Sequence, residues 1–330
     1  MTALLEVVGL ERRFPGSRGL LDMAARRPRP VVHALSGVSL QVRPGETLGI
    51  VGESGCGKST LARCMVRLIE PDAGRIVFDG QDVLALDGAA RRKFNRAVQM
   101  VFQDPYASLN PRMTVAATLT EALRVHRIVP DVEIPARVLQ LLDLVQLPAT
   151  AGPRYPHEFS GGQRQRIGIA RALSVEPRLI IADEPVSALD VSVQAQIVNL
   201  FMELQQRLGL TLVFITHDLR LVRYMAHRVA VMYLGRVVET GKVADIFANP
   251  RHPYTQALIR AVPQMTPRLL RGEAAVRGEL PSPLAPPSGC TFHPRCPVAI
   301  ARCAEELPAL QNRGGAWPVA CLLADQVDAG

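Results

Sequence analysis

The sequence has few aromatic residues and no long hydrophobic run. Phe, Trp and Tyr make up 5% of the 330 residues, with a single tryptophan. Because Glu, Asp, Arg or Pro interrupts every apolar stretch before the ~18 residues needed to span a bilayer, we expect no transmembrane helix. The Arg12-Arg13 pair is not followed by an apolar segment, so we expect neither a secretory nor a twin-arginine signal. The chain should therefore stay in the cytoplasm.

A basic stripe is also lacking, although the formal net charge is +8. Lys and Arg are dispersed, and they are not interleaved with the stacking aromatics that single-strand binders use. We therefore expect no nucleic-acid partner. The one local concentration lies in a Pro- and Gly-containing insertion and comprises Arg18, Arg26, Arg27 and Arg29. A solvated loop explains it more simply than a contact with acidic lipid headgroups or a protein partner.

A glycine-rich run, GESGCGKST, occupies residues 52–60. Its pattern Gly-x-x-x-x-Gly-Lys-Ser predicts a loop whose backbone N–H groups surround phosphate oxygens, with Lys58 at the β- and γ-phosphates and Ser59 on Mg²⁺. Thr47–Val51 predicts the strand that enters the loop, and Thr60–Ile69 predicts the helix that leaves it and adds its dipole. The residues expected to bind ATP are Gly52, Glu53, Ser54, Gly55, Cys56, Gly57, Lys58, Ser59 and Thr60.

Apolar runs predict further strands at 4–8, 39–42, 75–78, 97–102, 179–182 and 212–215. A helix at Val193–Leu208 separates the last two strands, and this alternation is typical of a mostly parallel α/β sheet. Between Asp104 and Arg171 the periodicity becomes helical, which predicts an inserted helical subdomain. We find no long internal repeat and expect a single ATPase unit.

Two later runs, FSGGQRQRIGIARAL at Phe159–Leu173 and LIIADEP at Leu179–Pro185, carry a family resemblance. Together with the glycine-rich run, they make residues 4–262 resemble the ATPases of the ATP-binding-cassette (ABC) family. The resemblance implies an α/β P-loop NTPase core of the RecA type with an antiparallel β subdomain and a helical subdomain at about 104–171. Phe159 departs from the commonest signature, which has Leu there.

The resemblance also implies roles for single residues. Asp183 would hold Mg²⁺ through water and Glu184 would polarise the attacking water, while Gln103 senses the metal and the γ-phosphate. His217 would contact the γ-phosphate, and Ser187–Asp190 would form the D-loop. The expected Mg²⁺ ligands are Ser59, Gln103 and Asp183.

In this family the signature residues of one subunit complete the ATP site of the other subunit, so hydrolysis requires a dimer. The signature residues expected to contact ATP are Ser160, Gly161, Gly162 and Gln163. Phe14 is the candidate for stacking on adenine, with His33 as the alternative.

Three segments resemble the dipeptide/oligopeptide importer ATPases, most of all the F-type subunits of dipeptide importers: Gln103–Arg112, Asn249–Thr255 and Pro281–Pro287. Nickel- and glutathione-type importers use similar ATPases. The resemblance implies a peripheral ATPase on the cytoplasmic face of the inner membrane, with a second ATPase subunit, two permeases and an extracytoplasmic solute-binding protein. The alternative is a soluble ABC protein acting on ribosomes or DNA, but those proteins resemble tandem cassettes or carry long coiled-coil insertions.

Four of the six cysteines fall in the predicted C-terminal extension, residues 263–330: Cys290, Cys296, Cys303 and Cys321. In a cytosolic protein such a set favours a metal over disulfides. No CxxC pair is present, and four thiolates suit an iron-sulfur cluster. The family resemblance likewise implies a [4Fe-4S] cluster, with zinc and free thiols as alternatives. Such loops tolerate any small residue at Cys56, so no role is expected for its side chain, although a thiolate near a predicted helix N-terminus would be comparatively reactive.

Overall fold

The structure is a computed structural model that describes residues 2–16, 29–261, 279–312, 314 and 317–324. Arg18, Arg26 and Arg27 of the basic insertion lie outside these residues. The chain divides into two compact units. The first unit comprises residues 1–4, 42–47 and 78–216, and the second comprises residues 5–41, 48–77 and 217–330.

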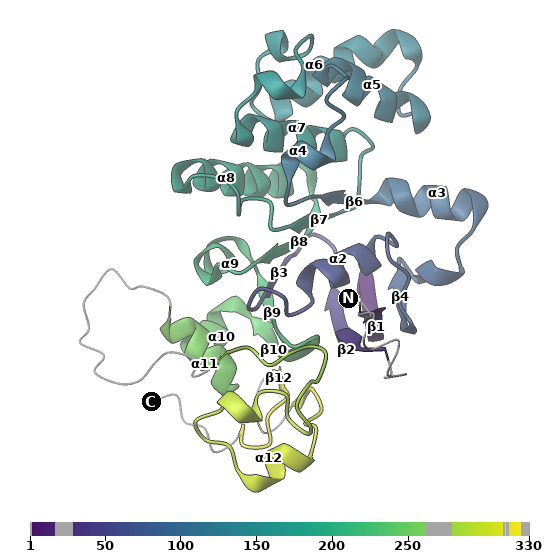
Figure 1. Cartoon of the computed structure of the whole chain (residues 1–330). Helices are drawn as coiled ribbons and strands as arrows, with labels where there is room; N and C mark the ends of the chain where they lie inside the picture. Colours follow the sequence, from purple (N-terminus) through teal and green to yellow (C-terminus); the bar gives the residue numbers. More distant parts are fainter. Residues whose placement is uncertain (1, 17–28, 262–278, 313, 315–316, 325–330) are drawn as a thin grey trace. The chain divides into compact units, whose positions relative to one another are not determined.

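Three parallel strands form the centre of the first unit, in the order β8-β7-β6 (Figure 1). Their bounds are β6 Val98–Val101, β7 Leu179–Asp183 and β8 Thr211–Thr216. Leu179 of β7 pairs with Val98 on one side and with Thr211 on the other. Every residue of β7 and β8 is buried, as expected for parallel strands that are covered on both faces.

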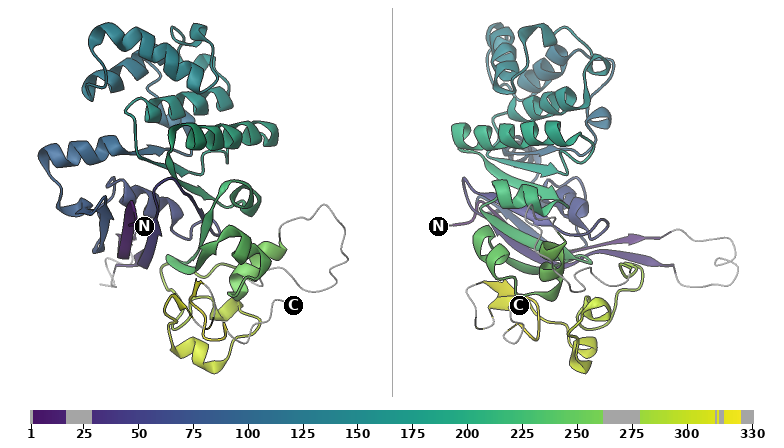
Figure 2. Two further views of the ribbon diagram at one scale, coloured as in Figure 1. Left: turned by 180° about the vertical axis from the view of Figure 1, so that it is seen from behind. Right: turned by 90° about the vertical axis from the view of Figure 1, so that its left-hand side faces the viewer.

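Helices account for most of the rest of this unit. They are α3 Gly88–Ala97, α4 Pro105–Ser108, α5 Val115–Val125, α6 Ile134–Leu144, α7 Gly161–Leu173 and α8 Val191–Leu208. The shorter elements are β5 Gln81–Asp82 and the 3-10 turns Val83–Ala85, Asp131–Glu133, Ala149–Ala151 and Pro156–Glu158. Both α5 and α6 contact α7, which itself contacts α8 and β6, so α7 is the central helix of the unit (Figures 1 and 2).

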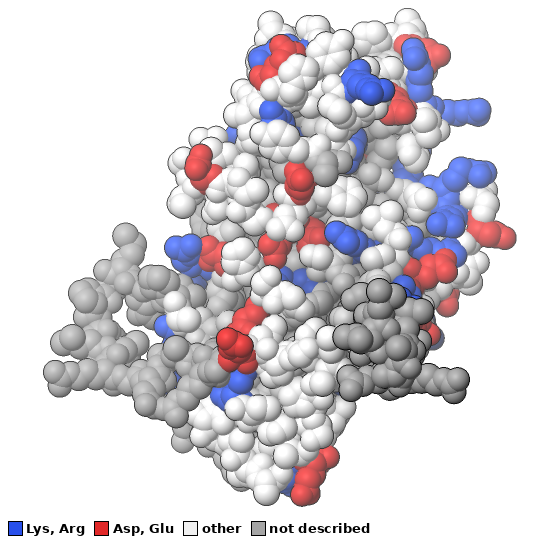
Figure 3. Space-filling view, in the orientation of Figure 1, with Lys and Arg blue, Asp and Glu red and all other residues white. Residues whose placement is uncertain are grey.

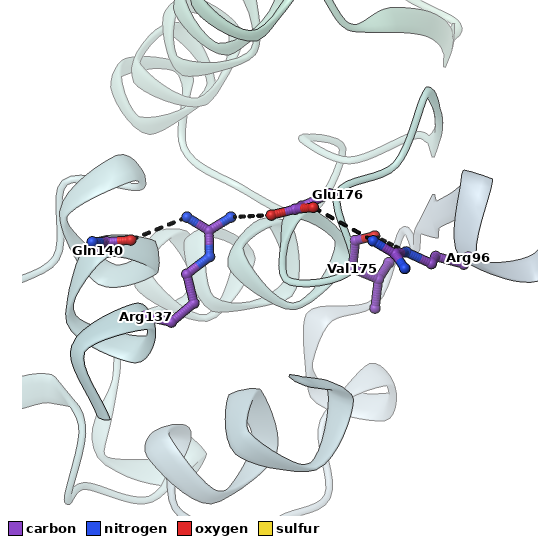
Figure 4. A network of polar contacts seen from close by, with 5 residues as sticks. All are labelled: Arg96, Arg137, Gln140, Val175 and Glu176. Atoms are coloured by element: carbon purple, nitrogen blue, oxygen red, sulfur yellow. Dashed lines mark hydrogen bonds and ion pairs between the residues drawn. The ribbon is translucent and has the colours of Figure 1, made fainter. Parts of the chain in front are cut away.

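A polar network centred on Glu176 joins three parts of the first unit (Figure 4). Its carboxylate accepts from Arg137 of α6 at 3.0 Å and from Arg96 of α3 at 3.5 Å. Arg96 also donates to the Val175 carbonyl at 3.1 Å, and Arg137 donates to Gln140 at 3.1 Å. Glu176 thus links α6 to α3, the helix that directly precedes strand β6 of the central sheet.

The second unit contains two sheets. Strands β2-β1-β4 form one, and β11-β12-β10-β9-β3 lie in that order in the other. The bounds are β1 Leu5–Pro15, β2 Val31–Val42, β3 Thr47–Val51, β4 Ala73–Phe78, β9 Arg228–Tyr233, β10 Arg236–Lys242, β11 Gln311–Asn312 and β12 Pro318–Val319. β3 runs parallel to β9, whereas β9, β10 and β12 are antiparallel neighbours.

Residues near the C-terminus join this second sheet. Glu239 of β10 is fully buried and pairs in register with Val319 of β12. Its carboxylate also accepts the indole N–H of Trp317 at 2.9 Å. The helices of the unit are α2 Lys58–Met65, α9 Leu219–Met225, α10 Val243–Ala248, α11 Pro253–Arg260, the 3-10 turn η5 His293–Arg295 and α12 Ala301–Glu305.

Every predicted strand is present, and three elements differ most from their predicted bounds. β1 and β2 extend well beyond 4–8 and 39–42, and α2 begins at Lys58 and ends at Met65 instead of spanning Thr60–Ile69. The helix stops before Pro71 because Arg67 adopts a left-handed backbone with φ 54°. No helix among the described residues is long and apolar enough to cross a membrane.

Charged residues of both signs are mixed over the face seen in Figure 3. The densest basic group on that face lies over α3, where Arg91, Arg92 and Lys93 are exposed. This second basic group was not singled out from the sequence.

Candidate functional site

The glycine-rich loop of the second unit connects β3 to α2. At two of its glycines there is no room for a side chain. A Cβ at Gly52 would lie 2.2 Å from the Met232 carbonyl oxygen of β9. A Cβ at Gly57, whose φ is 103°, would lie 2.3 Å from the Ala34 carbonyl oxygen of β2. Only glycine fits both places, so the neighbouring strands fix the path of the loop.

Lys58 lies inside this loop with only 4% of its surface exposed. Its Nζ donates to the carbonyls of Gly52 at 2.9 Å and Glu53 at 3.0 Å. No side chain of the described residues caps the N-terminus of α2 at Gly57. A buried ammonium beside an uncapped helix N-terminus is suited to bind an anion such as phosphate.

The remaining predicted loop residues differ in exposure. Ser54 and Gly55 are exposed at the tip of the loop, and Ser59 and Thr60 are half-buried in the first turn of α2. The expectation of a reactive thiolate at Cys56 is wrong. The side chain is 1% exposed, and burial raises the pKa of the thiol despite the nearby charge of Lys58.

In the first unit, two carboxylates stand at the end of β7. Asp183 is the last residue of the strand and is 3% exposed, and Glu184 follows it in a left-handed backbone with φ 45°. The Glu184 N–H donates to the Ile215 carbonyl at 3.0 Å, which anchors this unusual conformation to β8. A left-handed backbone costs free energy for residues other than glycine. Residues that keep such a conformation cluster at functional sites.

Gln103, just after β6, reaches the same place. Its Nε2 donates to Glu184 Oε2 and to Ser187 Oγ, both at 3.3 Å. Ser187 Oγ in turn donates to the Glu184 carbonyl at 3.1 Å. The structure therefore brings Gln103 and Glu184 together and adds Ser187, which was predicted only as part of the D-loop.

The predicted signature residues form the N-terminus of α7 in the first unit. Ser160 and Gln163 make a capping box: Ser160 Oγ accepts from the Gln163 N–H at 3.3 Å, and Gln163 Oε1 accepts from the Ser160 N–H at 3.1 Å. Ser160 is exposed, whereas Gly162 is buried against α8. Phe159, which replaces the commonest Leu, is 5% exposed and fills an apolar position.

The two adenine candidates both lie in the second unit. Phe14, near the end of β1, is half-buried, with the guanidinium of Arg12 over its ring at 4.7 Å. His33 of β2 is also half-buried, and its N–H donates to the Pro283 carbonyl at 3.0 Å. Phe14 already has a cation on one ring face, so only its other face could receive an adenine.

His217 directly follows β8 and is exposed. It belongs to the second unit, whereas Glu184 and Gln103 belong to the first. Its contact with a γ-phosphate stays a prediction. Of the expected Mg²⁺ ligands, Ser59 lies in the second unit and Gln103 and Asp183 lie in the first.

The four cysteines of the C-terminal extension share one region of the second unit. Burial raises the pKa of Cys296 to about 11, and charge on Cys321, Cys290 and Cys303 contributes. The Cys290 N–H also donates to the Cys303 carbonyl at 2.8 Å. However, within the described residues no group of three or more His, Cys, Asp or Glu side chains is placed to hold a metal. The thiols thus suit an iron-sulfur cluster chemically, but their arrangement does not support the expected one.

Comparison with known proteins identifies the class. The family model "ABC transporter" matches residues 35–187. A solved dimer of the ATP-binding cassette MJ0796, in a post-hydrolysis state bound to ADP and Pi, aligns with a TM-score of 0.62 at 28% identity. The alignment covers 72% of this chain and 98% of that one. The fold is that of an ABC transporter ATPase.

The rest of the chain defines the group within this class. The family model "Oligopeptide/dipeptide transporter, C-terminal region" matches residues 238–303. The probable peptide ABC transporter ATP-binding protein y4tS of Sinorhizobium fredii is 51% identical over 97% of this chain and 89% of its own length. The oligopeptide transport ATP-binding protein AppF of Bacillus subtilis is 50% identical over 97% of both chains. The chain belongs to the family of peptide-transporter ATP-binding proteins.

Proposed function

We propose that this chain is the subunit that hydrolyses ATP to drive peptide import. The proposal that the chain hydrolyses ATP rests on one observation. Asp183 and Glu184 lie next to each other at the end of β7, and Gln103 donates a hydrogen bond to Glu184 at 3.3 Å. Peptide as the transported substrate is supported by the match of residues 238–303 to the C-terminal region of peptide transporters.

Binding of ATP would use the loop of the second unit. Lys58 Nζ would exchange its bonds to the Gly52 and Glu53 carbonyls for phosphate oxygens, because a charge-assisted bond is the stronger one. The Ser59 hydroxyl and the Asp183 carboxylate are oxygen donors of the kind that Mg²⁺ prefers. When bound, Mg²⁺ neutralises charge on the phosphate oxygens.

Hydrolysis would use the carboxylate of Glu184. One of its oxygens would orient the attacking water and accept its proton, as a general base does. Gln103 and Ser187 hold Glu184 in position at the end of the strand. His217 would contact the γ-phosphate as it leaves. Positioning and charge stabilisation carry most of the catalysis in phosphoryl transfer.

A second ATPase subunit would complete the site. Ser160 is exposed, and the capping box orders the backbone at the N-terminus of α7. Across a dimer they would contact the γ-phosphate held by the partner subunit, together with Gly161, Gly162 and Gln163. The solved structure of MJ0796, a dimer bound to ADP and Pi, supports a dimer as the unit that binds nucleotide.

The further parts of the assembly are proposed from the family resemblance. They are two permeases and an extracytoplasmic solute-binding protein, with this chain peripheral on the cytoplasmic face of the inner membrane. We favour a dipeptide importer and an F-type subunit over nickel- or glutathione-type importers.

Co-purification tests this function. A tagged copy is isolated from membranes in mild detergent, its partners are identified by mass spectrometry, and the eluate is assayed for ATP hydrolysis with and without peptide-loaded binding protein. Recovery of two permeases and a second ATPase, with peptide-stimulated hydrolysis, is expected. Recovery of ribosomal or nucleoid proteins instead would overturn the transport function.

The [4Fe-4S] cluster at Cys290, Cys296, Cys303 and Cys321 is a separate proposal. It rests on the thiol chemistry alone: the charges of Cys321, Cys290 and Cys303 help to raise the pKa of Cys296, but no group of three or more potential ligands among the described residues is placed to hold a metal. Iron and sulfide are measured on protein purified without oxygen. About four irons per chain would support a cluster, whereas zinc or no metal would overturn it without affecting the ATPase.

A further inference from the structure

A side chain of the C-terminal extension binds the glycine-rich loop at residues 52–57, called the phosphate loop below. Arg295 of η5 binds the carboxylate of Glu53 through two parallel bonds, Nη1 to Oε2 at 2.9 Å and Nη2 to Oε1 at 3.2 Å. The two residues are 242 positions apart in the sequence. The Arg295 side chain is 7% exposed and that of Glu53 is 26% exposed, so water screens this pair only partly.

Glu53 is held by its backbone as well. Its N–H donates to the hydroxyl of Tyr254 at 3.0 Å, and its carbonyl accepts from Lys58 at 3.0 Å. The residue that follows the first loop glycine therefore has its N–H, its carbonyl and its carboxylate all engaged. Two of these three partners come from far along the chain.

An aromatic cluster fixes both partners. The rings of Tyr233, Tyr254 and Phe292 lie 4.7 to 5.4 Å apart by centroid, and each side chain is at most 1% exposed. The N–H of Arg295 donates to the Phe292 carbonyl at 3.0 Å, and its Nη1 donates to the Tyr233 hydroxyl at 3.4 Å. The position of Arg295 is thus set by a packed core and not by a mobile surface contact.

The charge of Arg295 is preserved in this setting. Burial alone would lower its pKa, but the bonds to Glu53 and Tyr233 outweigh burial and raise the pKa. This matters because the loop of Lys58 must accept a highly charged anion. An unbalanced carboxylate on Glu53 would repel that anion.

We propose that Arg295 is a positioning residue for the phosphate loop, through which the C-terminal extension sets the affinity of the cassette for ATP. The inference rests on the proposed function, since it assumes that the loop binds ATP. It assigns the extension a part in nucleotide binding. Arg295 neutralises Glu53 and fixes its side chain, while Tyr254 fixes its backbone.

The test measures ATP affinity and turnover separately. The full-length chain carries Arg295→Ala or Arg295→Lys, and binding of a fluorescent ATP analogue to the purified protein is followed by titration. The steady-state KM and kcat are measured with the partner subunits. We expect R295A to raise Kd and KM about tenfold, which is about 1.4 kcal/mol, with kcat changed less than about twofold. R295K should fall between, because Lys keeps the charge but loses the two-bond fork.

A matched control lies in the same extension. Arg302 pairs with Glu306 at 2.6 Å, but its side chain is 62% exposed, so R302A should leave Kd and KM unchanged. The double variant E53A/R295A should bind the analogue more tightly than R295A, because the unbalanced carboxylate is gone.

The outcomes separate this inference from the proposed function. If the wild-type chain binds ATP and R295A and R295K bind it equally well, the inference is overturned and the ATPase function stands. If R295A fails to fold, R295K decides by the same criterion. If the wild-type chain itself binds no nucleotide, the proposed function fails and the inference falls with it.

Discussion

Gly162 illustrates how the packing of the signature helix can be tested. A Cβ at this position would lie 2.4 Å from Cγ1 of Val193 on α8, about 1 Å short of the 3.4 Å at which ordinary contact begins. Val193 is half-buried and branched at Cβ, and a helix restricts it to one preferred rotamer, so it cannot turn away easily. Gly162→Ala should therefore move the N-terminus of α7 away from α8.

We expect two consequences of this displacement. Overpacking costs about 1 to 3 kcal/mol of stability, and a shift of about 1 Å in a positioning element can lower turnover about 10²-fold. The affinity of the isolated variant chain for ATP should hardly change, because the substitution leaves the loop of Lys58 intact and Gly162 would contact only the ATP held by a partner subunit. The measurements are urea unfolding, ATP titration and steady-state hydrolysis in the assembled complex.

The control is a second substitution that makes room. Val193→Ala removes the two methyl groups, so the double variant G162A/V193A should regain most of the lost turnover, while V193A alone should stay close to wild type. If the double variant is as slow as G162A, the reasoning from steric contact is refuted. The glycine would then be required for another reason, such as approach of its backbone to a phosphate.

Three further predictions concern single residues. Glu184→Gln should lower turnover by about 10² to 10⁴ while ATP binding survives, because a general base is lost but the phosphate loop is intact; an unchanged single-turnover rate would contradict the role of Glu184. The buried thiol of Cys56 should react slowly with iodoacetamide at neutral pH and quickly in urea, as read by mass spectrometry; fast labelling of the folded chain would count against its burial. Burial lowers the pKa of His252 to about 3, whereas an unfolded histidine titrates near ~6.5. Stability should therefore be lost as the pH falls below ~6.5, by about 2 kcal/mol between about pH 7 and pH 5. Urea unfolding at both pH values checks this, and His252→Gln should remove most of the pH dependence.

The parts of the site that are local in sequence could be predicted from it. The strand Thr47–Val51 was located correctly, and the start of the loop at Gly52 was as well, although the helix begins at Lys58 and so ends the loop earlier than predicted. A glycine pattern and an apolar run each report on neighbouring residues. The same holds for Leu179–Asp183, whose continuous burial follows from its apolar run.

Interactions across long sequence separations could not be predicted. The bond between Gln103 and Ser187 joins residues 84 positions apart, and that between Arg295 and Glu53 spans 242 positions. The burial of Cys56 was missed for a related reason. The sequence places a thiol near a helix N-terminus, but it does not reveal that the residue is 1% exposed in the fold.

Strand β9 explains how a distant extension can act on the phosphate loop. It pairs with β3, which leads into the loop, and its Met232 carbonyl lies where any side chain at Gly52 would have to go. The next residue, Tyr233, contacts both Tyr254 and Arg295, which hold Glu53. A change in the extension that moves Arg295 must therefore move either the aromatic cluster or Glu53. Because the aromatic cluster is closely packed and the Glu53 side chain is 26% exposed, we expect Glu53 and not the cluster to move.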